Sequence, residues 1–288
     1  MGRRGQIVNR VGQEHRQELA KLIKQASYSH ATWQIWDDLM YMSAAALSQP
    51  VSWVQAREDE YLRRIGRYDK KTQALFPQMF GEIILAFEQE GLVDVLGDMY
   101  MQLELHNKWK GQFFTPSHIC ELMAKMVDTD ITAEIENRGY ASIVDPCCGG
   151  GAMLLAYAKV AHEAGVNYQT DVLFVGQDID PVVARMCYIS MSLLGMPGYV
   201  IIGNSLLMDK ENWDYWFTPM YFIHGFQWRQ QQRETVEAVV SLTTSQENTE
   251  SSDTEIPETE KSTLQAAKET QVVEYNENKV GQLTLFSA

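Results

Sequence analysis

Three consecutive glycines, Gly149, Gly150 and Gly151, follow an apolar run and precede a helix-like run in the stretch ASIVDPCCGGGAMLLAYAKV, residues 141–160. A glycine turn between a strand and a helix lets a ligand come close to the backbone, because glycine has no side chain. Asp145 ends the apolar run, and a carboxylate there suits a cationic group of the ligand. The stretch therefore predicts a ligand site.

Three kinds of site compete for this glycine stretch. A P-loop needs Gly-Lys-Ser/Thr at the start of the helix, but Gly151 is followed by Ala152 and Met153. A dinucleotide-binding fingerprint needs a third glycine where this chain has Leu154. The third kind, a site for S-adenosylmethionine, remains.

The spacing of the acidic residues fits that third kind of site. Asp145 and the glycines would hold the methionine part of the cofactor, and Asp178, at the end of the next strand, would accept hydrogen bonds from the ribose hydroxyls. The segment between these two acids is long enough for one strand–helix–strand unit. Asn204, after a third strand, would meet the adenine amine. The alternative role for Asp178 and Asp180, just before Pro181, is to cap a helix.

Four motifs in order give this region a family resemblance. They are GQFFTP (111–116), DPCCGGGAML (145–154), GQDIDP (176–181) and GNSL (203–206). Together they resemble the amino-methyltransferases that modify adenine N6 in DNA, in particular the modification subunit of type I restriction systems. The resemblance covers about residues 105–210. It implies an α/β fold with a Rossmann-like methyltransferase sheet, methyl transfer to DNA, and S-adenosyl-L-methionine as the cofactor.

The resemblance also implies cofactor-binding residues, motif by motif. The FFTP element would contact the carboxylate end of the cofactor, the glycine motif would form the methionine pocket, and Ile179 would pack on the adenine ring. Asn204 stands where the family often has Asp. The implied set is Gln112, Phe113, Phe114, Thr115, Pro116, Asp145, Cys147, Gly149, Gly150, Gly151, Asp178, Ile179 and Asn204.

The family's catalytic motif, Asn-Pro-Pro followed by an aromatic residue, is absent from this chain. In that motif the Asn side chain and a proline carbonyl accept hydrogen bonds from the N6 amine of a flipped-out adenine, on which the aromatic ring stacks. The stretch at the expected distance is Thr218, Pro219, Met220 and Tyr221. Two hypotheses follow. The chain is an active adenine-N6 DNA methyltransferase that relies on a separate specificity subunit, or it is an inactive cofactor-binding protein with an accessory or scaffold role on DNA.

The elements that must position these residues fall into three parts. Residues 1–108 carry apolar residues at three- and four-residue spacing, which predicts an N-terminal helical domain. Residues 109–233 alternate short strand-like runs with helical ones, which predicts an incomplete parallel sheet flanked by helices. Ligands of such sheets bind at the carboxyl ends of the strands. Residues 234–288 are rich in Ser, Thr, Glu and Gln, which predicts a disordered acidic tail.

Composition limits the other classes of function. The formal net charge is −14, which does not favour DNA binding without a partner. The four cysteines include no zinc-type pair, so we expect no metal site and reduced thiols in the cytoplasm. No apolar run reaches the ~20 residues that a membrane span needs.

The last residues, GQLTLFSA, place an apolar cluster at the tip of the acidic tail. Such clusters usually mark an interaction site, although a return to the body as an edge strand is the alternative. The pentapeptide resembles the short motif by which bacterial replication and repair proteins bind the sliding clamp. The resemblance implies that Gln282, Leu283, Leu285 and Phe286 contact that partner.

Overall fold

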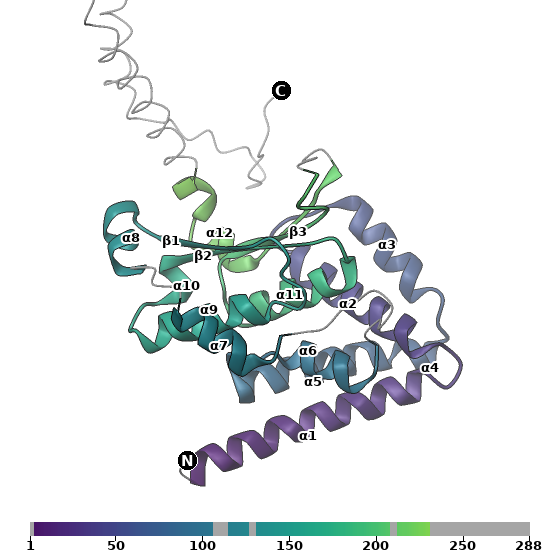
Figure 1. Ribbon diagram of the computed structural model, residues 1–288. Coiled ribbons are helices and arrows are strands. Elements are labelled where there is room, and N and C mark those ends of the chain that lie inside the picture. The colour runs from purple at the N-terminus through teal and green to yellow at the C-terminus, as the bar shows by residue number, and fades with distance from the viewer. Residues whose placement is uncertain (1–2, 106–114, 127–130, 208–211, 231–288) are drawn as a thin grey trace, which may run out of the picture. The chain divides into compact units, whose positions relative to one another are not determined.

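The computed structural model describes residues 3–105, 115–126, 131–207 and 212–230. Its elements follow the predicted succession of a helical region and then alternating strands and helices (Figure 1). They are α1 Arg3–Ala26, α2 Thr32–Ser48, α3 Gln55–Ile65, α4 Lys70–Gln73, α5 Leu75–Glu90, α6 Val95–Gln102, α7 Ser117–Met126, α8 Ile131–Arg138, β1 Ala141–Asp145, α9 Ala152–Glu163, α10 Tyr168–Asp171, β2 Val172–Asp178, α11 Pro181–Leu193, β3 Gly198–Ile202, β4 Asp214–Phe217 and α12 Pro219–Ile223.

The strands form a mixed four-stranded sheet in the order β1-β2-β3-β4. β1, β2 and β3 pair in parallel, as the sequence predicted, with Asp145 opposite Gly176 and Asp178 opposite Ile202. β4 runs antiparallel to β3, which corrects the expectation of an all-parallel sheet. The connection from Gly203 to Trp213 is too short for a crossover helix, and only an antiparallel neighbour can be reached by so short a link.

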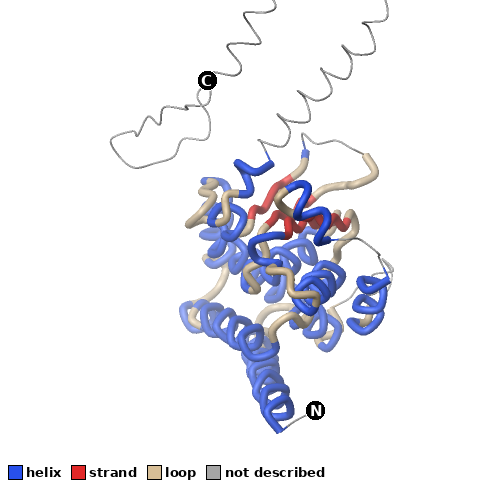
Figure 2. The backbone as a smooth tube through the Cα atoms, turned by 90° about the vertical axis from the view of Figure 1, so that its left-hand side faces the viewer, coloured by secondary structure: helices blue, strands red, loops and turns tan. Residues whose placement is uncertain are grey.

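Apolar clusters cover the two faces of this sheet. Ala141, Ile143 and Phe174 face the main core, which includes buried residues of α9 and α11. Leu173 and Val175 face a second cluster of buried residues that includes Tyr221 and Phe226. The strands lie at one end of a largely helical body (Figure 2). Successive side chains of a strand point to opposite faces of the sheet. Since consecutive residues of β2 are apolar and buried, both faces of the sheet are covered.

The core crosses the predicted boundary near residue 108. Leu19, Ile35 and Met79, from the N-terminal helices, belong to the same buried cluster as Leu154 and Ile189. The described residues up to position 230 belong to one compact unit, whereas the predicted acidic tail, residues 234–288, lies outside the described residues. The helical region and the sheet therefore share one core.

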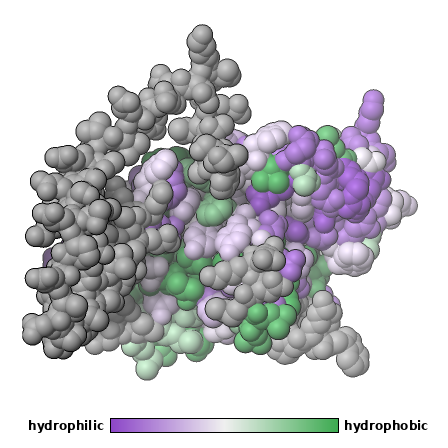
Figure 3. All heavy atoms as spheres, turned by 90° about the horizontal axis from the view of Figure 1, so that it is seen from above, coloured by the Kyte–Doolittle hydropathy of each residue, from purple (hydrophilic) through white to green (hydrophobic). Residues whose placement is uncertain are grey.

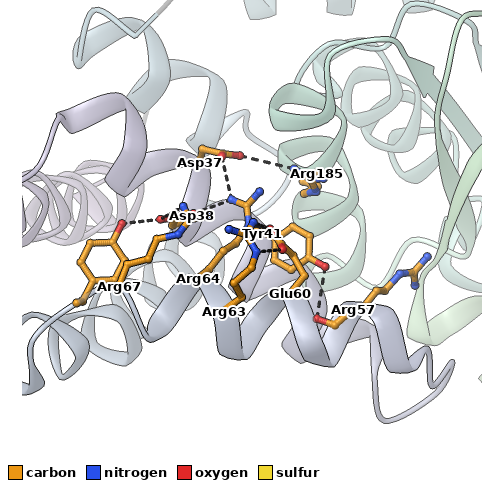
Figure 4. A network of polar contacts seen from close by, with 10 residues as sticks. Asp37, Asp38, Tyr41, Arg57, Glu60, Arg63, Arg64, Arg67 and Arg185 are labelled. Carbon is orange, nitrogen blue, oxygen red and sulfur yellow. Dashed lines mark hydrogen bonds and ion pairs between the residues drawn. The ribbon is translucent and has the colours of Figure 1, made fainter.

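A buried carboxylate joins α2 to α3 (Figure 4). Asp38 is fully buried and accepts hydrogen bonds from Arg64 Nη1 at 2.7 Å and from Tyr68 Oη at 2.6 Å. Arg64 also pairs with Asp37 at 2.8 Å, and Arg185 of α11 lies 3.6 Å from the same Asp37. Charges removed from water need such partners, so the network fixes α2, α3 and α11 against one another.

Arg57 of α3 holds the edge strand β4. Its guanidinium donates to Asp214 Oδ1 at 2.9 Å and to the Tyr215 carbonyl at 2.6 Å. It also lies 3.8 Å from the centre of the Trp216 ring, a cation–π contact. One side chain of the helical region thus contacts three consecutive residues of β4.

Asp94 gives the stability of the fold a pH dependence. Its side chain caps α6 by accepting from the Gly97 amide at 2.8 Å, and burial raises its pKa to about 6. A carboxyl group whose pKa is raised on folding stabilises the folded state while it is protonated. This stabilisation is complete below the ordinary pKa of about 4 and is lost as the pH rises through about 6.

We therefore expect Asp94→Asn, which keeps a capping oxygen, to stabilise the fold by about 1–3 kcal/mol at pH 7.5. The gain should shrink towards pH 4.5. Urea unfolding at both pH values measures it, with Glu88→Gln, at an exposed position of α5, as the control. The same difference between variant and wild type at both pH values would show that Asp94 does not titrate in this range.

Candidate cofactor-binding site

The two predicted acids lie at the same edge of the sheet. Asp145 ends β1 and Asp178 ends β2, and these strands are parallel neighbours. The carboxylates therefore stand side by side at the carboxyl ends of the strands, where α/β sheets bind ligands.

The glycine loop follows β1 and leads into α9. Gly149 and Gly151 have φ values of 51° and 95°, in the left-handed region that glycine adopts without strain. A Cβ atom added at Gly151 would lie 2.9 Å from the Cys187 sulfur. Backbone conformation and close packing thus both require glycine at position 151.

Asp178 braces this loop. Its Oδ2 accepts from the Gly149 amide at 2.9 Å, and its Oδ1 accepts from the Asp180 amide at 2.9 Å. Asp180 is the residue that caps α11, through the Val182 amide. The capping alternative therefore applies to Asp180, whereas Asp178 links the end of β2 to the loop after β1.

The pKa of the Asp145 carboxyl lies above its ordinary range because the group is largely removed from water. A hydrogen bond from the Cys147 amide at 3.0 Å acts in the opposite direction, and the nearby charge of Asp178 raises the pKa further. A cationic ligand at this edge would relieve both effects, since an opposite charge favours the ionised carboxylate.

Two buried thiols, those of Cys148 and Cys187, pack against the loop, and no sequence signal indicated this role. A Cβ at Gly176 would lie 3.1 Å from the Cys148 sulfur and 3.3 Å from the Cys187 sulfur. The Cys148 pKa is raised well above its ordinary value by the neighbouring Cys187 thiol and by burial. Cys148 is therefore a neutral packing group beside the buried Cys187, whereas Cys147 in the same loop is exposed.

Ile179 and Asn204 also lie at the carboxyl edge of the sheet. Ile179 follows β2 and is 67% exposed, so its side chain is available to pack on a planar ring. Asn204 follows β3, and its side-chain oxygen accepts from the Leu206 amide at 2.9 Å. That oxygen has a second lone pair, so the turn does not exclude a ligand contact.

Of the FFTP element, only Thr115 and Pro116 lie within the described residues, whereas Gln112, Phe113 and Phe114 lie outside them. Both residues are exposed and immediately precede α7, which packs on α9. The pKa of the Cys120 thiol in α7 is raised by burial and also by the charges of Asp94 and Asp145. α7 packs on α9, and α9 in turn packs on β1.

The predicted catalytic stretch lies at the other end of the sheet. Because β4 is antiparallel, Phe217 stands opposite Tyr199, at the amino end of β3. Thr218 Oγ1 accepts from the Gly198 amide at 3.1 Å and donates to the Met196 carbonyl at 2.9 Å. Tyr221 is buried in the second apolar cluster. The structure thus separates the set Thr218, Pro219, Met220 and Tyr221 from the cofactor-binding set.

Comparison with known proteins identifies the family. The sequence profile described as N-6 DNA Methylase matches residues 92–263, more than half of the chain. This chain belongs to the N-6 DNA Methylase family. The predicted recognition is thereby confirmed, and with it S-adenosyl-L-methionine as the cofactor and the α/β methyltransferase fold.

Curated relatives are methylase subunits of type I restriction enzymes. The MjaIX subunit of Methanocaldococcus jannaschii is 27% identical over 46% of this chain and 22% of its own length. The MjaVIII subunit of the same organism is 28% identical over 53% of this chain and 26% of its own length. The MpnII subunit of Mycoplasma pneumoniae is 27% identical over 48% of this chain and 25% of its own length. The matched part of this chain therefore spans about a quarter of these relatives.

Two solved structures are similar at low identity. One, from Listeria monocytogenes, is described as a class I S-adenosylmethionine-dependent methyltransferase and has 18% identity and a TM-score of 0.41, covering 69% of this chain and 55% of the other. The other is the type I restriction-modification methyltransferase subunit of Streptococcus thermophilus, with 18% identity and a TM-score of 0.28. That match covers 66% of this chain and 43% of the other.

The described residues fit the family's cofactor. S-adenosyl-L-methionine carries an ammonium group, a ribose diol and a planar adenine. The edge of the sheet offers the carboxylates of Asp145 and Asp178, the exposed Ile179, and a loop whose Gly151 has no room for a side chain. Among the residues with described positions, no group of three or more His, Cys, Asp or Glu side chains could hold a metal ion.

Proposed function

We propose that this chain binds S-adenosyl-L-methionine at the carboxyl ends of β1 and β2 and serves methyl transfer to adenine N6 in DNA. The observation that carries the proposal is the Asp178–Gly149 hydrogen bond of 2.9 Å, which joins the end of β2 to the glycine loop after β1 in a member of the N-6 DNA Methylase family.

Each residue of the pocket has a task that follows from its position. Asp145 is suited to the cofactor ammonium, because a cation offsets the burial and the neighbouring charge that raise its pKa. Asp178 can accept from the ribose hydroxyls while it holds the loop, since a carboxylate has about four acceptor sites. Ile179 would cover the adenine, and the cofactor, when bound, supplies an electrophilic methyl group.

The second candidate function is cofactor binding without turnover. The placement of Thr218 and Tyr221 favours it, since within the described residues this stretch brings no acceptor for the adenine amine to the pocket. Such a protein would be an accessory or scaffold protein on DNA.

One experiment separates the two candidates. The purified full chain is incubated with adenine-containing duplex DNA and the cofactor carrying a labelled methyl group, and cofactor affinity is measured by calorimetry in parallel. Labelled N6-methyladenine supports the enzyme, and binding without label supports the accessory protein. No binding at all would refute both.

The partners follow from the relatives named above. We propose that a specificity subunit supplies target recognition and contact with DNA, because the chain carries a net charge of −14 and acidic surfaces repel the phosphate backbone. No helix in the described parts of the chain is long and apolar enough to cross a membrane. The free cysteines, including the exposed Cys147, suit the reducing cytoplasm.

The C-terminal QLTLF peptide lies outside the described residues, and we propose that it binds the bacterial sliding clamp. A clamp on the duplex would raise the local concentration of an acidic protein near DNA. In a fluorescence titration, the labelled peptide 279–288 should bind purified clamp, and the same peptide with Leu285→Ala and Phe286→Ala should not. A peptide with Lys279→Ala is the matched control, and undetectable binding by the unchanged peptide would end the proposal.

A further inference from the structure

A cavity of about 620 Å³ lies where the C-terminal end of α1 meets α4 (Figure 1). Cavities of this size are typical of sites for small molecules. Its lining includes Lys21 and Lys24 of α1, Lys71 of α4, and the buried residues Thr72 and Leu75. Because the chain has a net charge of −14, three lysines around one cavity run against the overall charge.

Two of these lysines have no anionic partner in the parts of the chain that the structure describes. Lys24 and Lys71 form no ion pair there. Lys21 pairs with Glu18 at 2.8 Å, but their side chains are 72% and 46% exposed. An exposed pair of this kind contributes little free energy, so an anionic ligand can compete for Lys21 at small cost.

The carboxylate that lines the cavity, Asp69, is directed to the backbone of α4. It caps this helix by accepting from the Thr72 amide at 2.7 Å. Hydrogen bonds from Thr72 hold the pKa of Asp69 below its ordinary value, and the charge of Lys71 adds a smaller effect in the same direction. The cavity therefore keeps an excess of positive charge, which attracts an anion with several charges.

The cationic surface of α3 differs from that of the cavity. Seen from above, the most hydrophilic surface lies on the side of α3 (Figure 3). There Arg63 and Arg64 both pair with Glu60, at 2.5 Å and 2.6 Å. An anion at α3 would have to displace Glu60, whereas Lys24 and Lys71 present no such competitor.

The other polar groups of the cavity suit a base and a sugar. Tyr28 lies in the turn after α1 and is 96% exposed, so its ring has an open face on which a planar group can stack. The Gln25 amide and the Ser29 hydroxyl, which also line the cavity, can each donate and accept hydrogen bonds. Phosphates and a planar base are combined in a nucleotide.

We propose that this cavity binds a nucleoside diphosphate or triphosphate, with its phosphates between Lys24 and Lys71 and its base on Tyr28. The lining shares no residue with the proposed cofactor pocket. The inference therefore goes beyond the proposed function and does not depend on it.

A strand of nucleic acid fits this cavity less well than a single nucleotide. Glu14, Glu18 and Lys21 follow one another at four- and three-residue spacing, which places them on one face of α1. A strand that continued from the lysines along this face would bring its next phosphates to two carboxylates, which repel them.

The test is a calorimetric titration of the purified full chain with ATP. Saturating S-adenosyl-L-methionine is present, so that the adenosine part of ATP does not enter the cofactor pocket. ATP should bind, and Lys24→Gln with Lys71→Gln should weaken its binding about tenfold or more. The matched control is Lys125→Gln with Arg138→Gln, which removes the same charge at two half-exposed side chains and should leave the affinity unchanged.

Two further titrations identify the parts of the ligand and the site. Tyr28→Ala should weaken ATP binding about fivefold or more, because stacking is lost, and should leave the binding of inorganic tripolyphosphate unchanged. Asp178→Ala, titrated with ATP in the absence of the cofactor, should bind ATP as the wild type does. This last result is expected whether or not the cofactor pocket is assigned correctly.

Four results would overturn the inference. They are no binding of ATP by the wild type, equal affinity of the wild type and the Lys24→Gln, Lys71→Gln variant, equal ATP affinity of the wild type and Tyr28→Ala, or tighter binding of a short single-stranded oligonucleotide than of ATP. Loss of ATP binding in Asp178→Ala alone would place ATP in the cofactor pocket and equally refute a second site. Thermal unfolding of each variant checks that these exposed substitutions leave the fold intact.

Discussion

Asp178→Ala is expected to weaken the binding of S-adenosyl-L-methionine about tenfold to a hundredfold, or about 1–3 kcal/mol. The change removes the proposed acceptor for the ribose hydroxyls and also the 2.9 Å hydrogen bond to the Gly149 amide. The loop thus loses a hydrogen bond that holds it in place, and the cofactor loses a contact. Both losses weaken cofactor binding.

Calorimetric titration of the purified chain measures the effect, and two variants separate its causes. Asp178→Asn keeps an oxygen for the Gly149 amide, so it should restore thermal stability while recovering only part of the affinity. Asp180→Ala removes the cap of α11 and leaves the loop contact in place, so it should change stability more than affinity. Equal affinities of wild type and Asp178→Ala would show that the ribose does not bind here.

The positions of the glycine loop and of the two acids could be predicted from the sequence because their signals are local. The glycines report a backbone conformation, and Gly149 and Gly151 indeed have positive φ. Asp145 and Asp178 each end an apolar run, and parallel pairing of consecutive strands brings such ends together. Each step depends on neighbours in the sequence or on a general rule of sheet topology.

The packing beneath and beside the site depends on residues that are distant in the sequence. Arg57 holds Asp214, which lies 157 residues further along the chain, and nothing near either residue indicates the pair. Cys187 reads as one more apolar position of α11, yet its sulfur decides that residue 151 must be glycine. Such contacts follow from the packing of elements, which periodicity does not encode.

The placement of the TPMY stretch shows what motif spacing leaves open. Its distance from the glycine loop matches that of the family's catalytic motif, but distance along the chain carries no strand direction. The short link from Gly203 to Trp213 was the available signal, because it permits only an antiparallel neighbour. Because β4 runs antiparallel to β3, Thr218 lies beside the amino end of β3 and not beside its carboxyl end.

This placement gives Thr218 a structural role with a large expected effect. Its side chain is fully buried, and its hydroxyl satisfies both the Gly198 amide and the Met196 carbonyl. Thr218→Val keeps the shape and leaves these two buried groups unpaired. We expect a loss of about 2–4 kcal/mol in the free energy of unfolding.

Urea unfolding measures that loss, and Thr218→Ser, which keeps the hydroxyl, should recover most of it. At a temperature where Thr218→Val is still folded, its cofactor affinity should equal that of the wild type, because the pocket lies at the other end of the sheet. A catalytic Thr218 predicts the reverse: Thr218→Val would keep its stability and lose only methyl transfer to adenine.

Tyr221→Phe extends the comparison, since it removes only the hydroxyl that donates to Gln230 at 2.7 Å and keeps the ring that packs on Phe217 and Phe226. Should Thr218→Val unfold at the same urea concentration as the wild type, the two buried groups must find other partners and the structural role is wrong.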